Sequence, residues 1–285
     1  MSLPIQILLL LFFLFLTASL IFSMLGQGGG AFYVPMLVAL SIPFYIAATT
    51  SQVLIIVVSF SSMLVFAKAR TVDWKLVLLI EPPTNLGAFF GGYLSPYFPD
   101  YFAKLCFAAV LLFGAYYMYK TPKKHVRRFP SKHWWHWHRT RVAEEYTINV
   151  IILLPVMLLA GFVAGMLGVG GGLIKVPVVV LLGGVPMIIA VGSSSLMVGV
   201  TALTGFVGHM LRGHFDPRLT AVLAAAVLIG SQLGPRFAIK TDRTRLGKYF
   251  ALLLLAIAIW LIYGVIREYY PDLWLGILPR LSHRL

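Results

Sequence analysis

A short glycine-rich pattern occurs twice in this chain and constrains its fold more than any other feature. The pattern Met-Leu-Gly-X-Gly-Gly-Gly, with Val-Pro a few residues later, occupies residues 24–35 and again 166–177, at an offset of 142 residues. Glycine loses more backbone freedom on folding than any other residue, so each triplet predicts an interruption of a helix that leaves N–H groups unpaired. At membrane depth such backbone is tolerated only where it is buried in protein or lines a cavity.

The composition excludes a soluble domain. Of the 285 residues, 60% are hydrophobic and only 11% are charged, and the mean hydropathy is +0.90. Eight apolar stretches are long enough to span a hydrocarbon core of about 30 Å. They cover residues 4–25, 44–67, 76–94, 102–119, 147–167, 187–211, 219–238 and 249–263. We therefore expect a polytopic membrane protein.

Two further apolar runs follow the glycine triplets directly, at residues 31–42 and 173–185. Each is too short to cross the bilayer, so we interpret both as re-entrant half-helices. The predicted fold class is an all-α polytopic membrane protein with about eight transmembrane helices plus two re-entrant half-helices in two internal repeats.

The duplication extends beyond the glycines. After one inserted residue the offset becomes 143, and glycine, proline and aspartate positions continue to match. Pro43 matches Pro186, and Asp73 matches Asp216. Matched residues of these types at one offset indicate an internal repeat. We predict a first membrane repeat at residues 1–119, a basic cytoplasmic connector at 120–145 and a second membrane repeat at 146–285.

The formal net charge of +14 has its source mainly in the loops between membrane segments. Residues 120–141 alone contain eight Lys or Arg, which places this connector in the cytoplasm. This distribution favours contact with membrane lipid and argues against nucleic acid as a partner. Counts of loop cations are the same for parallel and inverted repeats, so charge does not decide between these arrangements.

A membrane protein of this length with a Gly-Gly-Gly-X-X-X-Val-Pro motif in each half resembles the TauE/SafE family of sulfite exporters, also called the toluene sulfonate uptake permease family. Val34 and Pro35 complete the first motif, and Val176 and Pro177 complete the second. The resemblance implies a transporter of small sulfur-containing anions, such as sulfite, sulfate, thiosulfate or organosulfonates, in the bacterial inner membrane. It implies neither the particular anion nor the direction of transport.

The triplets themselves are the predicted substrate site. A half-helix that begins after a triplet directs free N–H groups and the positive end of its dipole into the protein, where they can bind an anion. The alternative is that the glycines only allow close helix packing. The candidate substrate-binding glycines are Gly28, Gly29, Gly30, Gly170, Gly171 and Gly172.

Two ionisable residues inside apolar segments add candidates. Lys175 lies three positions after Gly172 and is a candidate for anion binding, although its long side chain could also extend to the membrane surface. Glu81 is a candidate for proton coupling, with a salt bridge to Lys175 or hydration near the cytoplasmic face as alternatives.

Polar residues at matched places in two long spans complete the predicted site. They are Ser51 and Gln52 in the first half, and Ser194 and Ser195 in the second. Their side chains could complete the hydration shell that the anion loses, or they could bond carbonyl groups of their own helices.

A secondary transporter is the predicted function, because the chain has no Gly-X-X-X-X-Gly-Lys loop that would bind ATP. A passive anion channel is the main alternative, and an intramembrane enzyme is less favoured because clustered catalytic side chains are missing from the spans. We expect no cofactor. We expect no metal either, although His133, His136 and His138 lie close together among Trp residues of the connector. A homo-oligomer is compatible with the small-residue helix faces.

Overall fold

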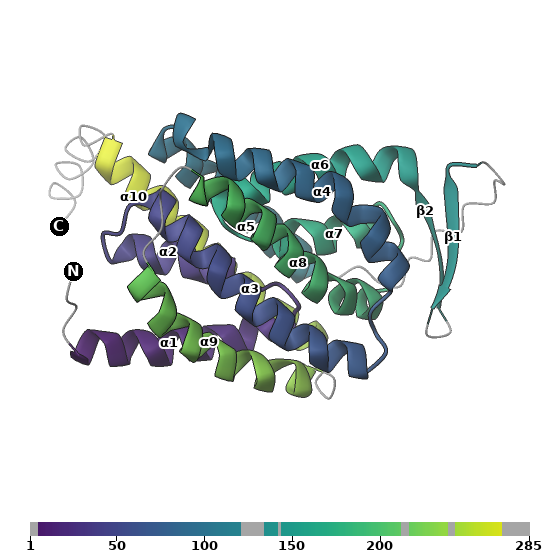
Figure 1. Cartoon of the computed structure of the whole chain (residues 1–285), viewed down its shortest axis with the longest axis horizontal. Helices are drawn as coiled ribbons and strands as arrows, with labels where there is room; N and C mark the ends of the chain where they lie inside the picture. The colour runs from purple at the N-terminus through teal and green to yellow at the C-terminus, as the bar shows by residue number, and fades with distance from the viewer. Residues whose placement is uncertain (1–4, 121–133, 142–143, 212–216, 239–242, 270–285) are drawn as a thin grey trace, which may run out of the picture.

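The computed structural model describes residues 5–120, 134–141, 144–211, 217–238 and 243–269 (Figure 1). Within these ranges the chain forms ten α-helices, one short 3₁₀ helix and one antiparallel strand pair. In chain order the elements are α1 (Ile5–Met24), α2 (Gly30–Ala39), α3 (Phe44–Lys68), α4 (Trp74–Leu94), η1 (Ser95–Tyr97), α5 (Asp100–Lys120), β1 (His136–Arg141), β2 (Glu144–Asn149), α6 (Val150–Leu167), α7 (Gly172–Leu181), α8 (Met187–Met210), α9 (Pro217–Ala238) and α10 (Arg243–Tyr269).

The predicted fold class, an all-α polytopic membrane protein, is confirmed. Six helices in the described ranges, α3, α5, α6, α8, α9 and α10, are long and apolar enough to cross a membrane. The other two predicted spans are also helical, as α1 and α4, and the two short runs form the ten-residue helices α2 and α7. That α1 and α4 cross the membrane, and that α2 and α7 are re-entrant, stay predictions.

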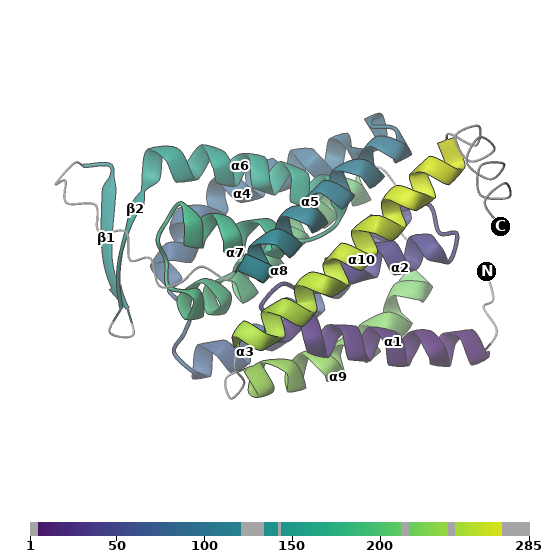
Figure 2. The same cartoon turned by 180° about the vertical axis from the view of Figure 1, so that it is seen from behind.

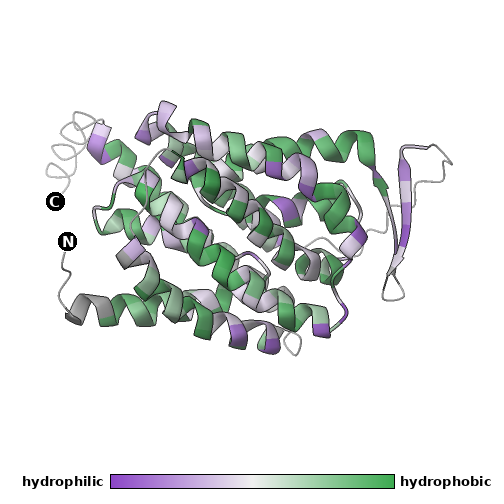
Figure 3. Ribbon diagram, in the orientation of Figure 1, coloured by the Kyte–Doolittle hydropathy of each residue, from purple (hydrophilic) through white to green (hydrophobic). Residues whose placement is uncertain are grey.

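Large apolar side chains cover the outside of the helical body. Phe13, Leu78 and Leu159 are each more than half exposed, and they lie on three different helices. Figure 3 shows hydrophobic residues along most of the helices and hydrophilic residues gathered in the strand pair. A surface of this composition fits a hydrocarbon surrounding rather than water.

Two helix pairs approach each other through glycine. A Cβ atom on Gly161 of α6 would meet the carbonyl oxygen of Thr84 in α4, and one on Gly230 of α9 would meet the carbonyl oxygen of Leu16 in α1. Small residues at such contacts let helix backbones come close together in membranes. In each pair, one helix comes from the first half of the chain and the other from the second half.

The two halves have opposite orientations. In Figure 1, α1 begins and α10 ends at one end of the body, whereas the strand pair and the start of α6 lie at the other end. The view from behind in Figure 2 agrees. Helices α1 and α6, which precede the two glycine patterns, run in opposite directions along the body. Charge counting had left the relative orientation of the halves open. The internal repeat itself stays a prediction.

The strand pair is a feature that the sequence analysis did not predict. Strand β1 pairs with β2 from His136↔Asn149 to Arg141↔Glu144, so residues 147–149, which we assigned to a span, belong to a strand. Trp137 is the one apolar residue of β1, so this strand carries no alternation of apolar and polar residues that would have predicted it. The remaining part of the predicted connector, residues 121–133, lies outside the described residues.

Asp73 ties this hairpin to the helices. Its carboxylate accepts hydrogen bonds from Arg139 at 2.9 Å, from the Tyr146 hydroxyl at 2.7 Å and from the Leu76 amide at the start of α4. Its own amide donates to Ser193 of α8. Burial alone would raise the pKa of Asp73, but the hydrogen bonds outweigh it and hold the pKa below its usual value. The carboxylate of Asp73 therefore joins α4, β1 and β2, and its backbone amide adds α8.

The glycine contact between α4 and α6 generates a prediction. Gly161→Ala should destabilise the protein by about 1–3 kcal/mol, because the added methyl group has to displace the α4 backbone. The matched control is Gly264→Ala in α10, where no atom lies within 4 Å of the added group. The control should be neutral or stabilising by up to about 1 kcal/mol.

Thermal unfolding of both variants in detergent, followed by tryptophan fluorescence, is the measurement. Equal melting temperatures for Gly161→Ala and the parent would contradict the close contact of α4 with α6.

Candidate functional site

Each glycine pattern ends one helix and begins a half-helix. Gly28 and Gly29 have φ angles of 77° and 95°, and Gly170 and Gly171 have φ angles of 67° and 83°. Side chains disfavour this left-handed region, so glycine is needed for the chain to reverse between α1 and α2 and between α6 and α7. The predicted interruptions of the helices are therefore present in the structure, at the predicted residues.

The two glycine turns pack against each other. A Cβ atom on Gly30, the first residue of α2, would lie 2.6 Å from the Cα atom of Val169. A Cβ atom on Gly172, the first residue of α7, would lie 2.7 Å from the Cα atom of Gln27. Val169 and Gln27 are matched positions, so the contact is reciprocal. The half-helices thus begin side by side and extend toward opposite ends of the body (Figures 1 and 2).

Four backbone amides in these turns have no partner. For the N–H groups of Gly28, Gly29, Gly170 and Gly171, no acceptor is found in the described part of the chain, and all four residues are buried. Buried N–H groups without a partner are rare in proteins. At the N-termini of two helices, they form a place where an anion can be bound.

Two of the hydroxyl groups predicted for the site bond the glycine turns. Ser51 of α3 donates to the Gly168 carbonyl at 2.9 Å, and Ser194 of α8 donates to the Gly26 carbonyl at 2.9 Å. Each serine thereby bonds the turn of the opposite half. Ser195 donates within its own helix, to the carbonyl of Gly192. The contacts of Ser195 with Gly192 and of Ser194 with the Val191 carbonyl match the alternative in which such hydroxyls bond carbonyl groups of their own helices.

Gln52 is bonded on one side only. Its Nε2 atom donates to the Gly165 carbonyl at 2.9 Å, whereas its Oε1 atom is buried without a partner in the described residues. Substrate contact by Gln52 and by the three serines stays a prediction.

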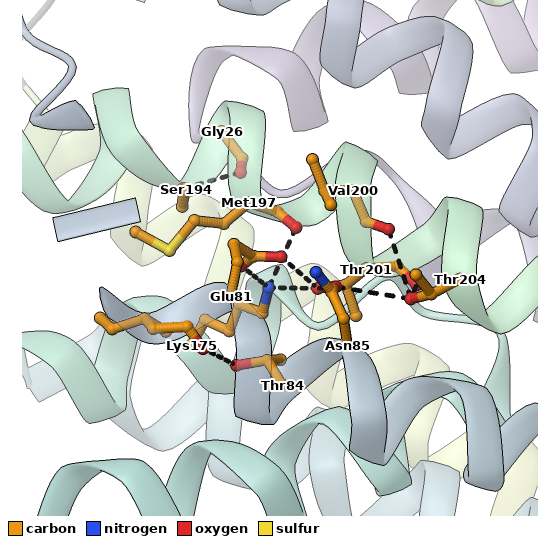
Figure 4. Close-up of polar contacts among 11 residues, drawn as sticks. Gly26, Glu81, Thr84, Asn85, Lys175, Ser194, Met197, Val200, Thr201 and Thr204 are labelled. Atoms are coloured by element: carbon orange, nitrogen blue, oxygen red, sulfur yellow. Dashed lines mark hydrogen bonds and ion pairs between the residues drawn. The ribbon is translucent and has the colours of Figure 1, made fainter. Parts of the chain in front are cut away.

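Lys175 and Glu81 form a buried ion pair (Figure 4). The Lys175 ammonium lies 2.5 Å from Glu81 Oε1 and also donates to the Met197 carbonyl at 3.0 Å and to the Thr201 hydroxyl. Lys175 is completely buried, so its side chain does not extend to the membrane surface. Of the alternatives for Glu81, the salt bridge to Lys175 is the one present. Anion binding by Lys175 and proton coupling by Glu81 stay predictions.

Thr201 of α8 is a member of this network that the sequence analysis missed. Its hydroxyl accepts from Lys175 and donates to Glu81 Oε2 at 3.1 Å, and it lies 3.4 Å from Asn85 Oδ1. Thr201 follows Ser194 by seven residues, which places both on one face of a helix. That spacing was the signal available in the sequence.

Two histidines of the connector, His136 and His138, lie away from this site in the strand pair. His136 and His138 belong to β1, and His138 Nδ1 lies 2.8 Å from the Thr147 hydroxyl. His133 is outside the described residues. Among the residues that the structure describes, no group of three His, Cys, Asp or Glu side chains is placed to hold a metal ion.

Comparison with known proteins agrees with the membrane architecture. The family model described as sulfite exporter TauE/SafE matches residues 11–261. The probable membrane transporter protein YunE of Bacillus subtilis is 27% identical over 259 residues, which cover 87% of this chain and 94% of that protein. A probable membrane transporter protein of Methanocaldococcus jannaschii is 27% identical over 159 residues, which cover 53% and 54% of the two chains. No solved structure matches.

The buried ion pair leads to a prediction about stability. Lys175→Met should destabilise the protein by about 3–5 kcal/mol, because it leaves the Glu81 carboxylate buried without its counter-charge. Combining it with Glu81→Gln should recover most of this loss. The measurement is a double-mutant cycle of thermal unfolding in detergent. If the losses of the two single variants simply add in the double variant, the pair is not coupled and the prediction is wrong.

Proposed function

The chain belongs to the sulfite exporter TauE/SafE family of multi-pass membrane transporters, and we propose that it is a secondary transporter of a small sulfur-containing anion such as sulfite, sulfate, thiosulfate or an organosulfonate. The observation that carries this proposal is the meeting of two half-helix N-termini, with four unpaired amides, at the junction of the two halves. Sulfite and sulfonate oxygens accept hydrogen bonds as phosphate oxygens do, so these amides suit them.

The opposite orientation of the two halves favours a carrier over a passive channel. Transporters with inverted halves commonly bind substrate between discontinuous helices and expose the site alternately on each side of the membrane. In this chain the discontinuous helices of both halves contribute to one junction, where the Gly30 and Gly172 contacts lie.

We assign the strand-pair end of the body to the cytoplasm of a bacterial inner membrane. The connector with its eight Lys or Arg residues leads to this end, and so does the loop between α3 and α4, which contains Arg70. Trp134 of the connector is 85% exposed, which suits contact with lipid headgroups.

Proton coupling is part of this proposal and rests on the ion pair. While Glu81 is ionised, it neutralises the Lys175 ammonium. When an anion binds beside the pair, its negative charge competes with the Glu81 carboxylate for the Lys175 ammonium, which favours the uptake of a proton by Glu81. One proton and one anion would then be bound together, a role typical of ionisable residues inside membranes.

Anion binding is the first test. Purified protein in detergent should be stabilised selectively by one of sulfite, sulfate, thiosulfate, taurine or sulfoacetate, with acetate and chloride as controls. At a hundredfold excess over Kd the stabilisation should be about 2.7 kcal/mol, seen as a rise in melting temperature of several degrees. Absence of a response to every sulfur anion would overturn the substrate assignment and leave the family membership unchanged.

Transport by Glu81→Gln tests the coupling. In proteoliposomes, uptake of the anion that stabilises the parent most should depend on an imposed pH gradient, and this dependence should be lost in the variant because Gln does not titrate. The matched control is Glu268→Gln, which alters the partly exposed ion pair with Lys104 and should keep the parent's pH dependence. A Glu81→Gln variant that still accumulates anion along the proton gradient would refute this role.

A further inference from the structure

Gln27 is a buried amide without any partner in the described residues. It is only 1% exposed, and neither its Nε2 nor its Oε1 atom has a hydrogen-bond partner there. Its Cα atom lies against Gly172, the first residue of α7. The side chain thus starts beside the N-terminus of this half-helix. An unpaired buried amide costs free energy, so its presence needs a reason other than stability.

Ser59 of α3 has the same property near the first turn. It is 1% exposed, its hydroxyl oxygen has no partner in the described residues, and this oxygen would lie 3.4 Å from a Cβ atom on Gly28. Ile55 and Val198 pack against both Gly28 and Gly170, one from α3 and the other from α8. Unpaired polar groups and two apolar side chains therefore surround the unpaired amides.

The two half-helices differ at their N-termini. At α2, the ring of Tyr33 lies over Gly29, and the neighbouring residue from the other turn is Val169. At α7, the aliphatic part of Lys175 lies over Gly171, with its Cε atom 3.3 Å from the Cβ position, and the neighbouring residue is Gln27. The α2 terminus is thus covered by the ring of Tyr33, whose buried hydroxyl has no partner in the described residues, and it has an apolar neighbour. The α7 terminus has a polar neighbour and the ion pair.

The charges around the N-termini of α2 and α7 suit a monoanion. With Glu81 ionised, the Lys175–Glu81 pair contributes no net charge. The N-termini of the two half-helices contribute about half a positive charge each, so together they balance about one negative charge. A dianion such as sulfate would leave one negative charge uncompensated in a medium of low polarity, which is costly.

Taking the proposed transport function as given, we infer that the anion binds at the N-terminus of α7 rather than equally at both half-helices. Gln27 and Ser59 contact the anion directly. The site selects a monoanionic sulfonate head over a dianion. The Gln27 amide donates to the sulfonate oxygens beside the amides of Gly170 and Gly171, and the Ser59 hydroxyl donates to them from the side of Gly28. Ile55 and Val198 provide the apolar side for the substituent on sulfur.

The test compares binding and stability in the full-length protein. Methanesulfonate and sulfate are titrated by calorimetry in detergent, and the melting temperature is measured without ligand. Gln27→Val introduces the residue found at the matched position of the second turn. It should weaken methanesulfonate binding about tenfold or more, because a hydrogen bond to a charged group is lost. It should also leave the ligand-free melting temperature equal or higher, because an unpaired buried amide is removed.

Ser59→Ala should behave in the same way, and Ser62→Ala is its matched control. Ser62 lies on the same helix and is equally buried, but its hydroxyl donates to the Ser59 carbonyl, so its removal should leave the affinity for methanesulfonate unchanged. The parent should bind methanesulfonate more tightly than sulfate.

Several results would overturn the inference. Unchanged methanesulfonate affinity in Gln27→Val would exclude the contact while leaving the transport proposal intact. Weaker binding together with a lower ligand-free melting temperature would mean that Gln27 acts on the structure. Tighter binding of sulfate than of methanesulfonate would exclude the monoanion site. A parent that binds neither these anions nor any other sulfur anion would instead remove the transport proposal on which the inference rests.

Discussion

The reciprocal contact of the two glycine turns is the constraint on which the rest of the structure depends. Gly30 lies against Val169 and Gly172 lies against Gln27, so a side chain at either glycine would meet backbone. Two serines strengthen the same junction, because each bonds the turn of the opposite half. Each turn therefore makes its packing contacts and its serine hydrogen bond with the other half of the chain. These contacts hold the two halves together at one centre.

The ion pair of Lys175 and Glu81 makes this centre asymmetric. Matched positions in the other half are Tyr33 and Ala224, which are uncharged. A buried ion pair contributes little net stability, because the loss of hydration offsets the attraction between the two charges. Its presence therefore points to a function more than to a source of stability. The pair joins α4, α7 and α8, and it lies beside the α7 terminus, where two of the four unpaired amides are found.

Sequence reasoning located the helices well, because apolar length and glycine patterns act locally. The eight predicted spans are helical and the two short runs form α2 and α7, although the strand β2 displaces the predicted start of one span. The strand pair was missed because its anchor, Asp73, lies far away in the sequence. Among the site residues, four of the six glycines adopt the left-handed conformation that favours glycine, and Ser51 and Ser194 bond backbone carbonyl groups.

The sequence by itself determined that this chain is an all-α membrane protein with two interrupted helices, since hydropathy and glycine content depend only on residue type. Tertiary structure alone decided that the halves have opposite orientations, that Lys175 is bound to Glu81 rather than extended to the surface, and that Gln27 and Ser59 lie unpaired beside the turns. These outcomes depend on which helices, far apart in the sequence, come into contact. Packing and hydrogen bonding across the junction decide those contacts, and local residue patterns in a single sequence do not encode them.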